Sequence, residues 1–295
     1  MSSDSQAQDR GRFDVTFWGV RGSIAAPGPT TARYGGDTLC LELRCDDQHI
    51  LIDMGSGARR LGRGLMDDVP RAGHEITILL SHLHTDHVIG FPFFGPLFDS
   101  RSRLTIIGDA SRPVSTRDGL ARLMSEPLFP VPLEEVPASL EFIDVAPGDS
   151  VNLGPVVVRT CALNHPGGAI GFRVEHRDRV LTHISDTEHV GDEPDPTLVA
   201  MCRDADVACY DAMFVEGVNY ERHCGWGHST WQAAVRLAEA AGVRRLVAVH
   251  HAPEHDDETL DRVARDMERA YPGALVAAEG LVIDVLSGEL ARSGG

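Results

Sequence analysis

Residues that can bind metal ions are concentrated in one short stretch of the sequence, residues 81–87 (SHLHTDH). Neutral imidazole and carboxylate groups are the usual protein ligands of zinc, manganese and iron. His82 and His84 lie two positions apart, so an extended turn can direct both rings toward one ion. Asp86 and His87 are adjacent, so the first turn of a following helix can direct them toward a second ion. The spacing therefore predicts a site for two metal ions.

The segments on either side of this stretch are apolar. Residues 76–80 (ITILL) are rich in β-branched side chains, which predicts a buried strand. Residues 88–94 (VIGFPFF) are also apolar. The histidines therefore sit on a turn between two buried elements. A turn that merely faces solvent would not gather four ligand-type residues in this position, so we favour the metal site over that alternative.

The pattern formed by residues 82–87 resembles the HxHxDH signature of the metallo-β-lactamase-fold hydrolases. In that family the signature follows a strand, as it does here. The resemblance extends over about residues 13–285 and implies an α/β fold, a four-layer αββα sandwich. We expect one domain over residues 13–290 and a flexible N-terminal tail over residues 1–12.

The resemblance also implies the remaining ligands, each at the end of a predicted strand. His165 is the expected third ligand of the first ion, and Asp186 is expected to bridge both ions. His250 is the expected third ligand of the second ion, with His251 as the second choice. Asp53 matches the family's first motif and is expected to hold the histidine turn from behind. The implied metal ligands are His82, His84, Asp86, His87, His165, Asp186 and His250.

Two branches of the family share features with this chain. Residues 227–253 look like the C-terminal half of the tRNA 3′-processing endonucleases, in which His228 would lie near the scissile phosphate. The turns at residues 19–23 and 33–38 look more like the small bacterial phosphodiesterases, including those that act on cyclic nucleotides. We find no insertion resembling the arm with which the endonucleases hold tRNA. The sequence therefore favours a small phosphodiester, such as a cyclic nucleotide, over a long nucleic acid.

The expected activity is hydrolysis of a phosphodiester by a hydroxide held between two divalent ions. Zinc is the expected metal, with manganese and iron as alternatives. His228 would stabilise developing charge or protonate the leaving oxygen, while Asp86 or Asp53 would accept a proton from water. An RNA 3′-end endonuclease is the alternative function. Hydrolysis of a thioester or lactone by the same ions is another, but it leaves His228 without a role.

The composition limits the other possibilities. The 295 residues carry a formal net charge of −17, which argues against a protein that binds polyanions through a basic surface. The six cysteines form no CxxC pair and no disulfide framework, and no apolar segment resembles a signal peptide or reaches transmembrane length. We therefore expect a cytoplasmic protein without membrane contact. A homodimer is one expectation for its oligomeric state.

Alternating and apolar segments predict the elements that carry these residues. A helix over residues 231–241 should begin at an N-cap Ser229 and end at Gly242. The proline-spaced segment 111–140 has two interpretations that the sequence leaves open, a lid over the site and a surface connection packed on a sheet. Strands are predicted at residues 13–20, 39–44, 49–53, 76–80, 103–108, 156–161, 169–175, 179–184, 207–210, 246–249, 275–278 and 281–285, and helices at 118–124, 231–241 and 258–271.

Overall fold

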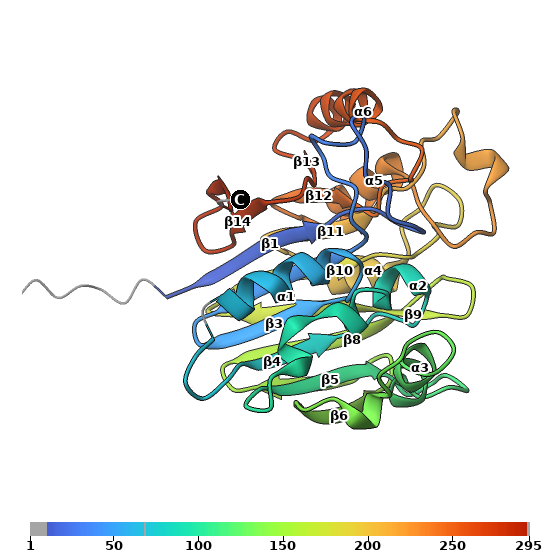
Figure 1. Cartoon of the computed structure of the whole chain (residues 1–295). Helices are drawn as coiled ribbons and strands as arrows, with labels where there is room; N and C mark the ends of the chain where they lie inside the picture. Colours follow the sequence, from blue (N-terminus) through green and yellow to red (C-terminus); the bar gives the residue numbers. More distant parts are fainter. Residues whose placement is uncertain (1–10, 68, 294–295) are drawn as a thin grey trace, which may run out of the picture.

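Two β-sheets pack face to face between two layers of helices in the computed structural model, which describes residues 11–67 and 69–293 (Figure 1). Most of the tail expected at residues 1–12 lies outside the described residues. The first sheet has the strand order β15-β14-β1-β2-β3-β4-β5-β6, and the second has the order β13-β12-β11-β10-β9-β8-β7. This arrangement confirms the expected four-layer αββα sandwich, while the single-domain boundary at residues 13–290 stays a prediction.

The first sheet combines antiparallel and parallel pairs. Its strands are β1 (Phe13–Gly19), β2 (Cys40–Cys45), β3 (Gln48–Ile52), β4 (Glu75–Leu79), β5 (Arg103–Asp109), β6 (Ser139–Val145), β14 (Leu281–Asp284) and β15 (Leu290–Arg292). The pairs formed among β3, β4, β5 and β6 are parallel. Their carboxyl ends therefore meet at one edge of the sheet.

The second sheet contains a similar parallel half. Its strands are β7 (Ser150–Leu153), β8 (Val156–Leu163), β9 (Ala169–His176), β10 (Arg179–Ile184), β11 (Val207–Asp211), β12 (Leu246–Val249) and β13 (Leu275–Val276). The pairs formed among β10, β11, β12 and β13 are parallel. The carboxyl ends of these strands supply the second set of site residues.

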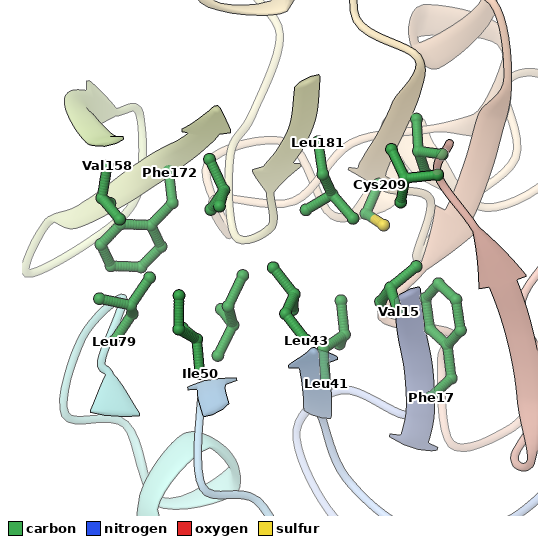
Figure 2. Close-up of a cluster of buried hydrophobic side chains, with 14 of the residues drawn as sticks. Val15, Phe17, Leu41, Leu43, Ile50, Leu79, Val158, Phe172, Leu181 and Cys209 are labelled. Atoms are coloured by element: carbon green, nitrogen blue, oxygen red, sulfur yellow. The ribbon is translucent and has the colours of Figure 1, made fainter. Parts of the chain in front are cut away.

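The main core lies between the sheets. Strand β1 shows why, because its alternate residues Phe13, Val15 and Phe17 are fully buried and point toward the opposite sheet. Burial of apolar surface at about 25 cal/mol per Å² is the main force that holds the sheets together. Figure 2 shows Val15, Phe17, Leu41, Leu43, Ile50 and Leu79 of the first sheet facing Val158, Phe172, Leu181 and Cys209 of the second.

Helices cover the two outer faces and bury two further apolar clusters. On the first sheet, α1 contributes Ala58 and Leu61. On the second sheet, α5 contributes Ala234 and Leu237, and α6 contributes Leu260. The helices are α1 (Gly57–Asp67), α2 (Thr85–Val88), α3 (Thr116–Leu123), α4 (Pro196–Cys202), α5 (Trp231–Ala241) and α6 (Asp257–Ala270), with short 3₁₀ turns at Phe91–Phe93, Gly95–Phe98, Leu133–Glu135 and Tyr220–Arg222.

Two local expectations are resolved by the structure. The N-cap of α5 is Thr230 and not Ser229, because the Thr230 hydroxyl accepts the N–H of Ala233 at 3.1 Å. The segment 111–140 packs on the outer face of the first sheet, where Leu120 and Leu133 are buried in the helix-side cluster. These contacts match the surface-connection interpretation for the part of the segment around residues 120–133.

Candidate metal centre

The histidine turn follows β4 and is fixed from behind by Asp53, which follows the neighbouring strand β3. Asp53 Oδ1 accepts the backbone N–H of Ser81 at 2.8 Å, and Oδ2 accepts the Ser81 hydroxyl at 2.9 Å. Asp53 Oδ2 also lies 2.8 Å from His87 Nδ1. Helix α2 starts directly after His84, so Asp86 and His87 lie in its first turn. One buried carboxylate therefore sets both the turn and the orientation of a histidine ring.

His82, His84 and His165 form the first group of candidate ligands. Their ligand nitrogens all lie within 4.8 Å of one another. His165 Nε2 is 3.0 Å from His84 Nδ1, while His165 Nδ1 donates to the carbonyl oxygen of Gly227 at 2.9 Å. Because Nδ1 of His165 carries the proton of that hydrogen bond, its Nε2 is free to bind a cation.

Asp86, His87 and His250 form the second group. Asp86 Oδ2 lies 3.2 Å from His87 Nε2 and 3.3 Å from His250 Nε2, and the two ring nitrogens are 3.2 Å apart. The backbone N–H of Ser23 also donates to Asp86 Oδ2 at 2.7 Å. Three potential ligand atoms thus converge on one point.

Asp186 stands between the two groups and faces both with different oxygens. Its Oδ1 lies 3.9 Å from His82 Nε2 and 3.7 Å from His165 Nε2. Its Oδ2 lies 3.2 Å from His87 Nε2 and 3.3 Å from His250 Nε2. The structure therefore brings all seven of the expected ligand residues together, with Asp186 in the position of a bridging group.

Backbone conformation at three strand ends is unusual. Asp53, Asp186 and His250 have φ values of +59°, +62° and +61°, in the left-handed region that side chains other than glycine rarely adopt. Such conformations cost about 1–3 kcal/mol each and cluster at functional sites. At each of these strand ends the left-handed residue directs a carboxylate or an imidazole toward the histidine turn or the ligand cluster.

The electrostatics of the cluster favour positive charge. Burial lowers the pKa of His250, but the carboxylates of Asp186 and Asp86 outweigh that effect and raise the pKa to about 9. Burial raises the pKa of Asp86, but His87 and His250 outweigh it and hold the pKa far below its ordinary value. The carboxylates thus stay ionised and require a proton or a cation beside them.

The donor set fits divalent metal ions. His82 Nε2 is buried and forms no hydrogen bond with any described residue, although it faces the cluster. A buried polar atom without a partner costs free energy, and a metal ion would supply the missing interaction. Imidazole nitrogens and carboxylate oxygens are the ligands preferred by zinc and similar ions.

His228 lies beside the cluster together with Asp211, a residue that the sequence analysis did not single out. His228 Nδ1 is 2.9 Å from Asp211 Oδ2, and the His228 ring stacks on that of His250 at 4.9 Å between centroids. Asp211 is fully buried and also accepts the backbone N–H groups of Asp186 and Ser229 at 3.0 and 3.2 Å. Its signal was an aspartate at a strand end, as at Asp53 and Asp186.

Other histidine and carboxylate side chains near the cluster take supporting positions. His251 turns away from the cluster, because its Nε2 donates to the carbonyl of Ala277 at 2.9 Å, so His250 is the histidine that faces the other ligands. His183 lies behind the site, 3.8 Å from Asp53 Oδ2. Glu188 accepts the N–H groups of Gly225 and Gly227 and thereby fixes the loop that contacts His165.

Comparison with known proteins places the chain in a family. The Beta-lactamase superfamily domain matches residues 48–251. This match covers the histidine turn and the strands that carry the other candidate ligands. The chain therefore belongs to the beta-lactamase superfamily, the family that its metal-binding signature resembled.

Several relatives and solved structures are similar over most of their length. Ribonuclease Z of Haloarcula marismortui is 25% identical over 321 residues, which covers 90% of this chain and 94% of that protein. The short form of human tRNase Z has a TM-score of 0.64 at 24% identity and covers 92% of this chain and 99% of its own. A diphosphatase of the PhnP family has a TM-score of 0.66 at 18% identity, with 96% and 100% coverage.

Two further findings concern membrane-spanning helices and the state of the cysteines. None of the helices formed by residues 11–67 and 69–293 is long and apolar enough to cross a membrane. All six cysteines are free, five of them buried and Cys224 exposed.

Proposed function

We propose that this protein is a two-metal phosphodiesterase that cleaves RNA near its 3′ end. The observation that carries the proposal is the His228–Asp211 pair beside a seven-residue ligand cluster. Ribonuclease Z relatives that match almost the whole chain support the RNA substrate. Because of these relatives we place RNA above the small cyclic nucleotide that the sequence favoured as the substrate.

We assign one ion to the group formed by His82, His84 and His165, and the other to Asp86, His87 and His250, with Asp186 shared between them. Zinc is the proposed metal, with manganese and iron as alternatives of the same ligand chemistry. When bound, two such ions neutralise the charge of a phosphodiester and lower the pKa of water from about 15.7 toward about 7.

His228 is the proposed catalytic acid or charge-stabilising group. Its Nδ1 is committed to Asp211 Oδ2, so Nε2 is the atom left to contact the substrate. Asp211 is buried and held by three backbone N–H groups, including that of Met213 at 3.1 Å. The pair therefore fixes the tautomer and direction of the His228 ring, as general acid–base catalysis requires.

The two aspartates considered as proton acceptors differ in their surroundings. Both oxygens of Asp53 are engaged by Ser81 and His87, and the side chain is fully buried. We therefore propose that Asp53 positions His87 and takes no proton from water. Asp86 lies among the ligand atoms, so of the two aspartates we propose Asp86 as the one that contacts the attacking water.

A small phosphodiester remains the second candidate substrate, favoured by the net charge of −17. Such a charge opposes binding of long RNA except where bound cations reverse the local field. A phosphodiesterase for short or cyclic nucleotides would use the same ions and the same His228–Asp211 pair.

The test is a substrate panel with the purified protein and each metal. The panel contains a tRNA precursor with a 3′ extension, a 2′,3′-cyclic and a 3′,5′-cyclic nucleotide, bis(p-nitrophenyl) phosphate, an acyl thioester and nitrocefin. Cleavage of the precursor at its 3′ extension, lost in His82→Ala together with bound metal, is the expected result. Hydrolysis of the cyclic nucleotides alone would select the second candidate, and hydrolysis of the thioester alone would overturn both.

A further inference from the structure

A small cavity adjoins the first ligand group and has no role in the chemistry described above. Its volume is about 230 Å³, and the imidazoles of His82 and His84 form part of its lining. A group next to a phosphate held at the ligand cluster would therefore have this cavity beside it. Its other lining residues are Leu80, Leu83, Asp109, Arg112, Pro113, Val114, Thr116, Gly167 and Gly168.

Most of this lining is apolar, with Leu83, Pro113 and Val114 among the walls. Leu83 packs against α3. Its side chain lies so close to Gly119 that a Cβ at this position would come within 2.4 Å of it. A mostly apolar slot that also presents a guanidinium suits a flat heterocycle with a polar edge. Because ligand pockets usually enclose about 300–1,000 Å³, this smaller one suits a single ring system and not a longer chain segment.

Arg112 is the positively charged group of the cavity lining, and only part of its guanidinium is used by the protein. Its Nε donates to Asp109 Oδ2 at 2.7 Å, and Asp109 is buried and also accepts the N–H of Ser111 at 2.8 Å. Neither Nη1 nor Nη2 of Arg112 donates to any residue within the described ranges. The arginine is thus anchored at one end and offers free N–H donors at the other.

The backbone next to this guanidinium is a glycine, Gly168. Gly168 has a φ of +79°, and a Cβ at this position would lie 1.6 Å from Arg112 Nη2. The positive φ favours glycine at this position, and the absence of a side chain lets the Arg112 guanidinium lie directly across the Gly168 backbone. Gly167, next to it, would place a Cβ 3.8 Å from His84 Nε2. The guanidinium and the ligand histidines therefore share one small space.

We infer that this cavity binds the nucleobase next to the scissile phosphate and that Arg112 selects guanine. Guanine presents two adjacent acceptors, O6 and N7, to the paired donors of arginine, whereas adenine presents a donor beside N7. The Asp109 carboxylate neutralises the guanidinium, which favours a neutral acceptor edge over a second phosphate group. This inference rests on the proposed phosphodiesterase function and adds the identity of the base.

Equilibrium binding tests the inference without requiring turnover. Calorimetric titration of the zinc-loaded protein with GMP and AMP should show tighter binding of GMP, by about tenfold, as one good bidentate contact provides. Arg112→Gln should abolish this difference, and Arg112→Lys should reduce it. Arg117→Gln is the matched control. This substitution removes the same charge from an exposed position on α3, and Arg117 is not among the residues that line the cavity.

A kinetic arm separates this inference from the proposed function. Guanosine and adenosine 5′-(p-nitrophenyl) phosphates carry a base, and methyl p-nitrophenyl phosphate does not. Arg112→Gln should raise KM for the guanosine substrate alone and leave methyl p-nitrophenyl phosphate unchanged. Equal GMP and AMP binding by the wild type would overturn the base assignment, as would binding of inorganic phosphate that depends on Arg112. GMP selectivity without hydrolysis of any phosphodiester would overturn the proposed function and leave only the assignment of guanine to this cavity.

Discussion

Asp53 Oδ2 lies 2.8 Å from His87 Nδ1, and both side chains are fully buried. The contact ties the end of β3 to the first turn of α2 and leaves His87 Nε2 directed at Asp86, Asp186 and His250. A carboxylate in this position fixes the tautomer of a metal-binding histidine and raises its basicity. The histidine turn therefore depends on a residue that lies outside the HxHxDH pattern.

Asp53→Asn should weaken metal binding while leaving the fold in place. Loss of such a supporting carboxylate typically costs about 10- to 100-fold in metal affinity or activity. Competition with a coloured chelator measures the affinity, and excess metal should restore much of the activity. Unchanged affinity in a folded variant would contradict the positioning role.

His228→Asn should lower the rate and spare the metal content. The proposed acid or charge-stabilising role is worth about 10²- to 10⁴-fold in kcat. Asp211→Asn should produce a smaller loss through the orientation of His228. Elemental analysis alongside steady-state kinetics distinguishes this result from ligand loss. A fall in bound metal equal to that of His82→Ala would identify His228 as a ligand instead.

Gly22→Ala should disrupt the second ligand group. A Cβ on Gly22 would come within 2.3 Å of the His250 ring, so the ring or the loop must move. Overpacking of this kind costs about 1–3 kcal/mol, and we expect reduced metal binding as well. The control is Gly64→Ala in α1, where a Cβ would meet nothing within 4 Å. That variant should gain about 0.4–1 kcal/mol in urea denaturation.

The stability of the first sheet should depend on pH through Glu42. Burial raises the pKa of this carboxyl, but contacts with His49, Arg44 and Trp18 outweigh it and lower the pKa to about 2. Above the ordinary pKa of 4.5 the stabilisation is fully present. Between that pH and about 2 the unfolded chain takes up a proton that the folded chain does not, so the contribution declines.

Glu42→Gln should therefore be destabilised near neutral pH and less so in acid. Urea denaturation of wild type and variant between pH 6 and 3, with chelator present, measures the difference in the free energy of unfolding. The chelator removes competition between protons and metal ions. A constant difference across this range would show that the charge of Glu42 contributes nothing.

The histidine turn and the strand ends could be predicted because their signals are local. Four ligand-type residues between apolar segments identify a metal site, and Asp186 and His165 each follow a β-rich segment. The resemblance then supplied the pairing of residues far apart in the chain. The four-layer fold followed from the same resemblance.

What the sequence did not indicate depended on geometry that only the folded chain defines. Asp211 has the same local pattern as Asp53, but its role arises from the approach of the loop that carries His228. Ser229 and Thr230 are both suitable caps, and the backbone direction selects Thr230. Arg112 lies in a proline-spaced segment without periodicity, so nothing in the sequence places it beside His84.

Because the ligands come from distant parts of the chain, metal binding also indicates whether the chain has folded. Asp86 and His250 are 164 positions apart in the chain and follow strands of different sheets, yet their side chains are 3.3 Å apart. Contacts of such high sequence separation form only after a large loop-closure cost has been overcome. A tightly bound ion in the second group would therefore identify molecules whose two halves have docked. Because it binds both halves, it would also oppose their separation.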